Sequence, residues 1–175
     1  MGQATAPFQI LEATIDSIHA VFKSGQLTCR QLVQTYIDRI DALDKAGPAI
    51  NSIIAVSSTA LAEADRLDDA YRSSGPIGPL HGIPVILKDQ IDAQGMATTL
   101  GSVLFKNFYP DKDAFIVEKM RHAGAVILGK ATLGELGGGD THGSLFGSTK
   151  NPYALERTVG GSSGGSSAAI AARIV

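Results

Sequence analysis

The stretch Ile83-Pro84-Val85-Ile86-Leu87-Lys88-Asp89 decides the predicted fold, because an unbroken apolar run ends there abruptly on two charged residues. A near-continuous apolar run of this length is typical of a strand that is buried on both faces, as in a parallel sheet. A second such run, at residues 125–128, follows a predicted helix over residues 111–123. This alternation predicts a mixed, mostly parallel α/β sheet flanked by helices on both faces.

The spacing of apolar residues predicts helices and strands in the rest of the chain as well. Apolar residues at helical or strand spacing predict four more elements: helices over residues 11–22, 29–43 and 60–71, and a strand over residues 50–56. Thr28 and Gln31 have the spacing of a capping box, in which each side chain bonds the backbone of the other residue. The alanine-rich residues 166–175 predict a last helix. A chain of 175 residues is expected to form a single domain, residues 1–175.

The composition is that of a protein that buries a core. The chain carries 15 Lys and Arg against 17 Asp and Glu, a formal charge of −2, and 44% of its residues are hydrophobic. This balance argues against nucleic-acid binding, and no apolar run is long enough to predict a membrane span. We expect neither a secretory signal nor a lipid anchor in residues 1–6. The single cysteine, Cys29, is expected in ordinary packing and fits a cytoplasmic protein.

Residues 160–167, Gly-Gly-Ser-Ser-Gly-Gly-Ser-Ser, are the first candidate for chemistry. A flexible linker is one interpretation of such a composition. The apolar helix predicted after it favours a rigid loop at a helix N-terminus, where N–H groups and hydroxyls face negative charge. No lysine stands where a phosphate-binding loop needs one, so nucleotide binding is disfavoured. Serine hydroxyls in a constrained loop suit proton transfer or acyl transfer.

A serine nucleophile needs a base, and Lys88 fits this role best. No Ser-His-Asp grouping is evident among the four histidines, His19, His81, His122 and His142. Lys88 directly follows a predicted buried strand, at the sheet edge where open α/β sheets place their ligand crevices. Burial there favours the neutral amine, which accepts a proton. Asp89 and Asp92 favour the charged form, so the direction of their side chains decides the outcome.

Four motifs, in this order along the chain, resemble the amidase signature family. They are Pro-Leu-His-Gly-Ile-Pro-Val-Ile-Leu-Lys-Asp at residues 79–89, Ala-Gly-Ala-Val-Ile-Leu-Gly-Lys-Ala-Thr at 123–132, Phe-Gly-Ser-Thr-Lys-Asn-Pro-Tyr at 146–153 and Gly-Gly-Ser-Ser-Gly-Gly-Ser at 160–166. The similarity runs from about residue 10 to the last residue. A chance match to all four motifs together is improbable, so the resemblance is specific.

The resemblance implies hydrolysis or transfer at carboxamide bonds by a Ser, cis-Ser, Lys triad, without a metal or cofactor. By matching motif, Lys88 resembles the family's basic lysine and Ser162 its bridging cis-serine. The loop that lines the family's acyl pocket is similar to Leu136, Gly137, Gly138 and Gly139. The implied partner is a small-molecule amide. Fatty amides, peptide C-terminal amides, aryl amides and the glutamine of tRNA-linked amidotransferases all stay open as substrates.

The family's acylated serine, and the Gly-Gly-Ser turn that stabilises the oxyanion, belong beyond Val175. The implied relay therefore reaches a serine that is not in this chain. We expect a sheet that is incomplete at its C-terminal side, with an exposed edge that a homo-oligomer or a missing C-terminal segment covers. Two functions follow: an amidase-type hydrolase of carboxamide bonds, or a catalytically inactive truncated homologue that binds a ligand or complements another chain.

Overall fold

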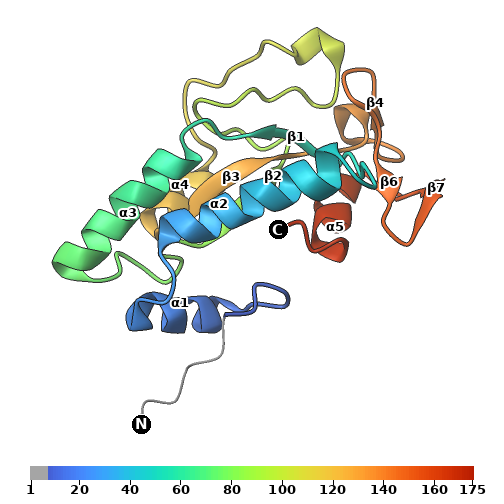
Figure 1. The fold of residues 1–175 in the computed structure, drawn as a ribbon. Coiled ribbons are helices and arrows are strands. Elements are labelled where there is room, and N and C mark those ends of the chain that lie inside the picture. The colour runs from blue at the N-terminus through green and yellow to red at the C-terminus, as the bar shows by residue number, and fades with distance from the viewer. Residues whose placement is uncertain (1–7) are drawn as a thin grey trace.

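A computed structural model describes residues 8–175, and a three-stranded sheet lies at its centre (Figure 1). The strand order is β1-β3-β2. β3 (Val126–Ala131) lies in the middle and is buried along its whole length. β2 (Pro84–Lys88) runs parallel to β3, whereas β1 (Ile53–Val56) runs antiparallel to it. The architecture is therefore mixed α/β.

The prediction of a mostly parallel sheet is wrong. Among the described residues, only the β2–β3 pair is parallel. Two small antiparallel sheets follow β3 in the chain, and their strands are β4 (His142–Gly143), β5 (Gly147–Ser148), β6 (Lys150–Asn151) and β7 (Ala154–Thr158). An apolar run indicates that a strand is buried, but the direction of the strand depends on connections that the run does not contain.

One face of the central sheet packs against a core that three long helices and α5 share. These helices are α1 (Ile15–Ser24), α2 (Cys29–Arg39), α3 (Ala60–Ser74) and α5 (Gly164–Ala171). The predicted capping box opens α2: Gln31 N donates to Thr28 Oγ1 at 3.1 Å, and Thr28 N donates to the Gln31 side chain at 3.0 Å. The π-helical turn Ile40–Lys45 continues α2, so the predicted apolar stripe is one continuous helical segment.

The opposite face is covered by α4 (Phe115–His122) and the long connection that follows β2. This connection contains one short 3₁₀ helix, Val103–Phe105. Leu87 and Ile127 point toward this side and pack with Met96 and Val117 in a second core. Because successive strand residues point to opposite faces, β2 and β3 separate the two cores. Helices therefore lie on both faces of the sheet (Figure 1).

β2 is an edge strand. Within residues 8–175 it pairs with β3 alone, and Pro84, Val85 and Ile86 are only half-buried. The prediction of a strand buried on both faces is wrong for β2 and correct for β3. An apolar pocket of about 440 Å³ lies along β2. Its lining includes Ile15, Ile18, Tyr36, Ile83, Ile170 and Val175.

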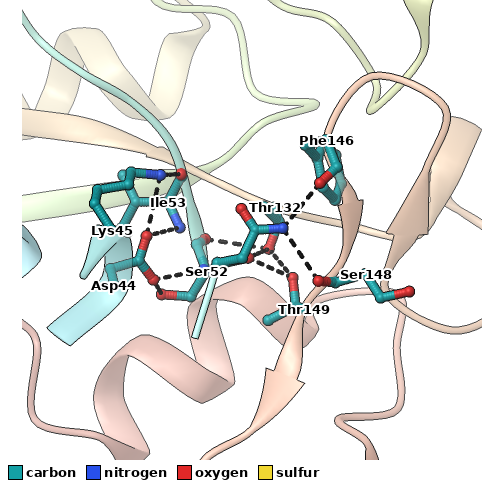
Figure 2. A network of polar contacts seen from close by, with 9 residues as sticks. Asp44, Lys45, Ser52, Ile53, Thr132, Phe146, Ser148 and Thr149 are labelled. Carbon is teal, nitrogen blue, oxygen red and sulfur yellow. Dashed lines mark hydrogen bonds and ion pairs between the residues drawn. The ribbon is translucent and has the colours of Figure 1, made fainter. Parts of the chain in front are cut away.

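A buried polar network fixes the start of β1 and the end of β3 (Figure 2). The carboxylate of Asp44 accepts hydrogen bonds from the backbone N–H and the hydroxyl of Ser52, both at 2.5 Å. The hydroxyls of Thr132 and Thr149 lie 2.6 Å apart, and Thr149 Oγ1 donates to the carbonyl of Asn51 at 2.8 Å. The network holds Thr132, the residue after β3, in a defined position beside the start of α5.

The glycine- and serine-rich loop leads directly into α5, which begins at Gly164, two residues before the predicted start. Gly164 and Gly165 are buried, and Ala168 and Ala169 pack in the first core. A loop whose end is buried in the domain is not a flexible linker. No helix in residues 8–175 combines the length and the apolar character needed to cross a membrane. Residues 1–6, where we expected no signal or lipid anchor, lie outside the described residues.

Candidate active site

Lys88 is the last residue of β2 and lies opposite Ala131 in the register of β2 and β3. Side chains alternate along a strand, so Lys88 lies on the face of the sheet that α5 covers. Leu87 and its register partner Lys130 lie on the other face. Lys88 is half-buried. The strand therefore carries an amine to its carboxyl end on the side of the serine-rich loop.

Ser162 lies in the loop before α5 and receives a hydrogen bond from Lys88. Lys88 Nζ donates to Ser162 Oγ at 2.7 Å, and the two residues are 74 positions apart in the chain. The peptide bond between Gly161 and Ser162 is cis. Ser162 is half-buried, whereas the neighbouring Ser163 is exposed. The structure thus brings the two candidate catalytic residues into direct contact.

Thr141 holds the serine loop on both sides of Ser162. Its backbone N–H and its hydroxyl donate to the carbonyl of Gly160 at 2.9 and 2.7 Å, and its Oγ1 accepts from Gly164 N at 3.0 Å. Gly134 N donates to the carbonyl of Ser162 itself at 2.9 Å. These contacts fix the backbone that presents the hydroxyl. The sequence pattern contained no sign of Thr141, because its partners lie 19 and 23 residues away in the chain.

Two glycines of the loop are required by close approach rather than by an unusual backbone angle. A β-carbon at Gly161 would overlap the carbonyl oxygen of Gly139, and one at Gly165 would overlap Thr132 Oγ1. Glycine is the residue that allows a backbone to approach so closely. The loop therefore packs against the Gly139 region on one side and against the end of β3 on the other.

The stretch of Leu136, Gly137, Gly138 and Gly139 lies beside this loop, as the Gly139–Gly161 contact shows. Leu136 N donates to the carbonyl of Leu100 at 2.8 Å, and the Leu136 side chain is 62% exposed. Positions 138 and 139 face open space, with nothing within 4 Å of an added β-carbon. Leu136 thus supplies the one large side chain of this stretch, and that side chain is exposed.

Asp89 points away from Lys88, which answers the question that the sequence left open. Its carboxylate is fully buried on the opposite side of the sheet, where Oδ2 accepts hydrogen bonds from the backbone and the hydroxyl of Thr99 at 2.9 and 2.7 Å. Its Oδ1 lies 3.4 Å from Lys130 Nζ. Within residues 8–175, no carboxylate oxygen lies within 4.0 Å of Lys88 Nζ.

Lys130 is fully buried, and its ammonium is surrounded by oxygen acceptors. Besides the Asp89 carboxylate, Nζ donates to the carbonyls of Asp89 and Ala97 at 2.9 and 3.0 Å, and to Thr98 Oγ1 at 3.3 Å. Burial lowers the pKa of Lys130, and the negative charge of Asp89 opposes that shift. Lys130 lies inside the motif at residues 123–132, but the sequence pattern alone predicted no role for it.

The histidines and the cysteine lie in other contacts. His19, His122 and His142 each bond a neighbour through a ring nitrogen, and His81 Nδ1 accepts from a backbone N–H. None of these bonds involves the lysine or the serine of the candidate site. Cys29 is buried at the start of α2, and burial raises the pKa of its thiol. A protonated, buried thiol is a packing residue rather than a nucleophile.

The fold and the contact together define a class: a mixed α/β protein in which a strand-end lysine meets a serine in a glycine-rich loop. Comparison with known families agrees with this class. A family model described as Amidase matches residues 31–175. The chain therefore belongs to the amidase family.

Curated relatives and solved structures give the same result. A glutamyl-tRNA(Gln) amidotransferase subunit of Alkaliphilus metalliredigens is 44% identical over 166 residues, which are 94% of this chain and 33% of that protein. The structure of peptide amidase from Stenotrophomonas maltophilia superposes with a TM-score of 0.92 at 39% identity, over 97% of this chain and 36% of that one. The corresponding amidotransferase subunit from Thermotoga maritima superposes with a TM-score of 0.77 at 34% identity, over 96% of this chain and 33% of that one. The chain spans about a third of the length of these relatives.

Proposed function

We propose that the chain supplies the lysine and cis-serine part of an amidase-type hydrolase that acts on carboxamide bonds. The observation that carries the proposal is the 2.7 Å contact between Lys88 Nζ and Ser162 Oγ. The hydrogen bonds of Thr141 to Gly160 and Gly164 support the proposal, because a proton relay needs a hydroxyl that is held in one place. Membership of the amidase family gives the class of bond.

The proposed relay moves one proton in each direction. Neutral Lys88 accepts the proton of Ser162, and Ser162 accepts the proton of a nucleophilic serine as that serine attacks the carboxamide carbon. The proton then returns through Ser162 to the leaving amine as the C–N bond breaks. Water repeats the sequence to release the carboxylic acid from the acyl-serine. We propose that the nucleophile is a serine outside these 175 residues, as the family resemblance implies.

The segment that carries this serine is the proposed cover of the free edge of β2. Within residues 8–175 this edge of β2 has no partner strand, and the apolar pocket lies beside it. Relatives are about three times as long as this chain, so they contain further residues that could cover the corresponding strand edge. We favour this occupant over a second copy of the chain. Light scattering of the isolated chain distinguishes the two occupants. We expect a monomer, and a dimer of residues 1–175 would contradict our preference.

The proposed partner is a small-molecule carboxamide whose acyl group lies beside Leu136. Both kinds of relative, a peptide amidase and an amidotransferase, are named for amide chemistry. No atom lies within 4 Å of a β-carbon added at Gly138 or Gly139, so these two positions do not themselves block a substrate that approaches the serine loop. A cytoplasmic location, without nucleic acid or membrane as partner, stays our prediction.

A chimera tests the relay directly. Residues 8–175 replace the matching third of the Stenotrophomonas maltophilia peptide amidase, and hydrolysis of C-terminal peptide amides is measured for the chimera and its Lys88→Ala and Ser162→Ala variants. We expect turnover by the chimera and a loss of about 10²- to 10⁴-fold in each variant, the usual size of an acid–base contribution. Lys119→Ala, a change on the exposed surface of α4, is the control. Equal activity in all four proteins would overturn the proposal.

The second candidate function is that of a catalytically inactive homologue, and the coverage of about a third of the relatives' length is the observation that makes it worth testing on the isolated 175 residues. The purified chain is therefore tested beside the chimera for amide hydrolysis and for labelling by a fluorophosphonate. An active chimera and an inactive isolated chain support a nucleophile supplied from outside. A folded chimera without turnover supports the inactive homologue instead.

A further inference from the structure

We infer that Lys130 is a positioning residue for the site: it binds the Asp89 carboxylate on the far face of the sheet and so keeps that negative charge from the Lys88 amine. The inference rests on the proposed role of Lys88 as the base. Asp89 directly follows Lys88, so its carboxylate is the nearest one in the chain. A carboxylate beside an amine stabilises the ammonium form, which is unable to accept a proton.

The register of the sheet explains why the two lysines have separate partners. Lys88 pairs with Ala131, and Leu87 pairs with Lys130, so the two lysines point to opposite faces. Asp89 continues the alternation beyond β2 and points to the Lys130 side, where both side chains are fully buried. One lysine therefore meets a hydroxyl, and the other meets the carboxylate.

Hydrogen bonds hold both members of the buried pair in place. Thr99 donates two hydrogen bonds, from its backbone and its hydroxyl, to one oxygen of the Asp89 carboxylate. The nitrogen of Lys130 faces acceptors: the carbonyls of Asp89 and Ala97, and the hydroxyl of Thr98. An ammonium has three donors and no acceptor, so it matches these surroundings. Lys130 is thus the cationic partner of the Asp89 carboxylate on this face of the sheet.

The segments around Lys88 carry few charged side chains. The connection after β2 contributes Asp89 and Asp92, β3 contributes Lys130, and the segment after β3 contributes Glu135 and Asp140. The loop before α5 and the helix itself contain no ionisable side chain in residues 160–172. Removal of Lys130 therefore changes the charge balance at Lys88 mainly through Asp89.

The test measures the amine of Lys88 without any need for turnover. The 175-residue chain is trace-labelled with acetic anhydride between pH 6 and 11, and the peptide that contains Lys88 is quantified by mass spectrometry. In Lys130→Met, the unpaired Asp89 carboxylate should move the midpoint of Lys88 labelling up by about one pH unit. In Lys130→Met/Asp89→Asn, which lacks both charges, the midpoint should return to that of the parent chain. Lys119→Met, which removes an exposed lysine of α4, should leave it unchanged.

Circular dichroism first establishes that each variant is folded. An unchanged midpoint in folded Lys130→Met, or a raised midpoint in the double variant, would overturn the inference. If Lys130→Met does not fold, the Asp89→Asn variant is measured instead. There Lys130 lacks its carboxylate partner, so its positive charge should lower the pH midpoint of Lys88 labelling. An unchanged midpoint would contradict the inference. Because labelling reports Lys88 alone, failure of this inference is distinct from an inactive chimera, which would be the failure of the proposed function.

Discussion

Lys88 is the last residue of β2 and Lys130 the second-last residue of the neighbouring strand β3, and the two amines differ in burial and in hydrogen-bond partners. Lys88 is half-buried, faces the α5 side and donates to the hydroxyl of Ser162. Lys130 is fully buried, faces the other side and meets the Asp89 carboxylate and several further oxygen atoms. A register difference of one residue separates them. Because side chains alternate between the two faces of the sheet, the Lys130–Asp89 ion pair lies on one face and the candidate base Lys88 lies on the other.

The largest effect we expect is the loss of chimera activity when Lys88 is replaced by a residue that stays charged. Arginine is not deprotonated in proteins, so Lys88→Arg should lose about as much chimera activity as Lys88→Ala, roughly 10²- to 10⁴-fold. The measurement is kcat/KM for a peptide amide. Retention of activity in Lys88→Arg alone would mean that a positive charge, and not a proton acceptor, is what the site needs.

The second-largest expected effect is a loss of unfolding free energy when Lys130 is replaced. Lys130→Met leaves the buried Asp89 carboxylate without its partner, and breaking such a pair typically costs about 3 to 5 kcal/mol of unfolding free energy. Lys88→Met removes one hydrogen bond from a half-buried residue and should cost about 1 kcal/mol. Urea unfolding of the two variants measures the difference, and equal losses would contradict the contrast between the lysines.

A third prediction concerns the close contact between the serine loop and the end of β3. Gly165→Ala places a methyl group against Thr132, so overpacking should cost about 1 to 3 kcal/mol and should displace the loop that carries Ser162. Gly138→Ala is the matched control, because its added carbon faces open space. Thermal unfolding compares the two. A Gly165→Ala chain as stable as Gly138→Ala would show that the close approach is not required.

The smallest effect is the pH dependence that His81 contributes. Burial lowers the pKa of His81 and the nearby His19 lowers it further, against an opposing effect of Asp68, so the folded chain protonates this ring less readily than the unfolded chain does. The unfolded chain takes up a proton below about pH 6.5. The contribution of His81 is therefore complete above that pH and is lost as the pH falls toward the folded-state pKa. Urea midpoints for the parent and His81→Gln between pH 5 and 8 should converge at low pH, and parallel curves would contradict this account.

The sequence predicted the parts of the site that depend on local pattern. The apolar run that ends at Lys88 indicated a strand with an amine at its tip, and the Gly/Ser run next to an alanine-rich segment indicated a rigid loop before a helix. The strand directions were not predictable, because burial produces the same apolar run in a parallel and an antiparallel strand. The direction of Asp89 and the clamp by Thr141 depend on register and on contacts between distant segments, which a local pattern does not contain.

Chemical rescue of Lys88→Ala by methylamine tests the central claim most directly, because it returns an amine without the side chain. If Lys88 accepts a proton through Ser162, methylamine should restore hydrolysis by the chimera in proportion to its free-base concentration as the pH is raised. Tetramethylammonium, a cation without a titratable proton, should restore nothing. Equal rescue by both compounds, or rescue that follows the methylammonium concentration, would contradict the role of Lys88 as a base.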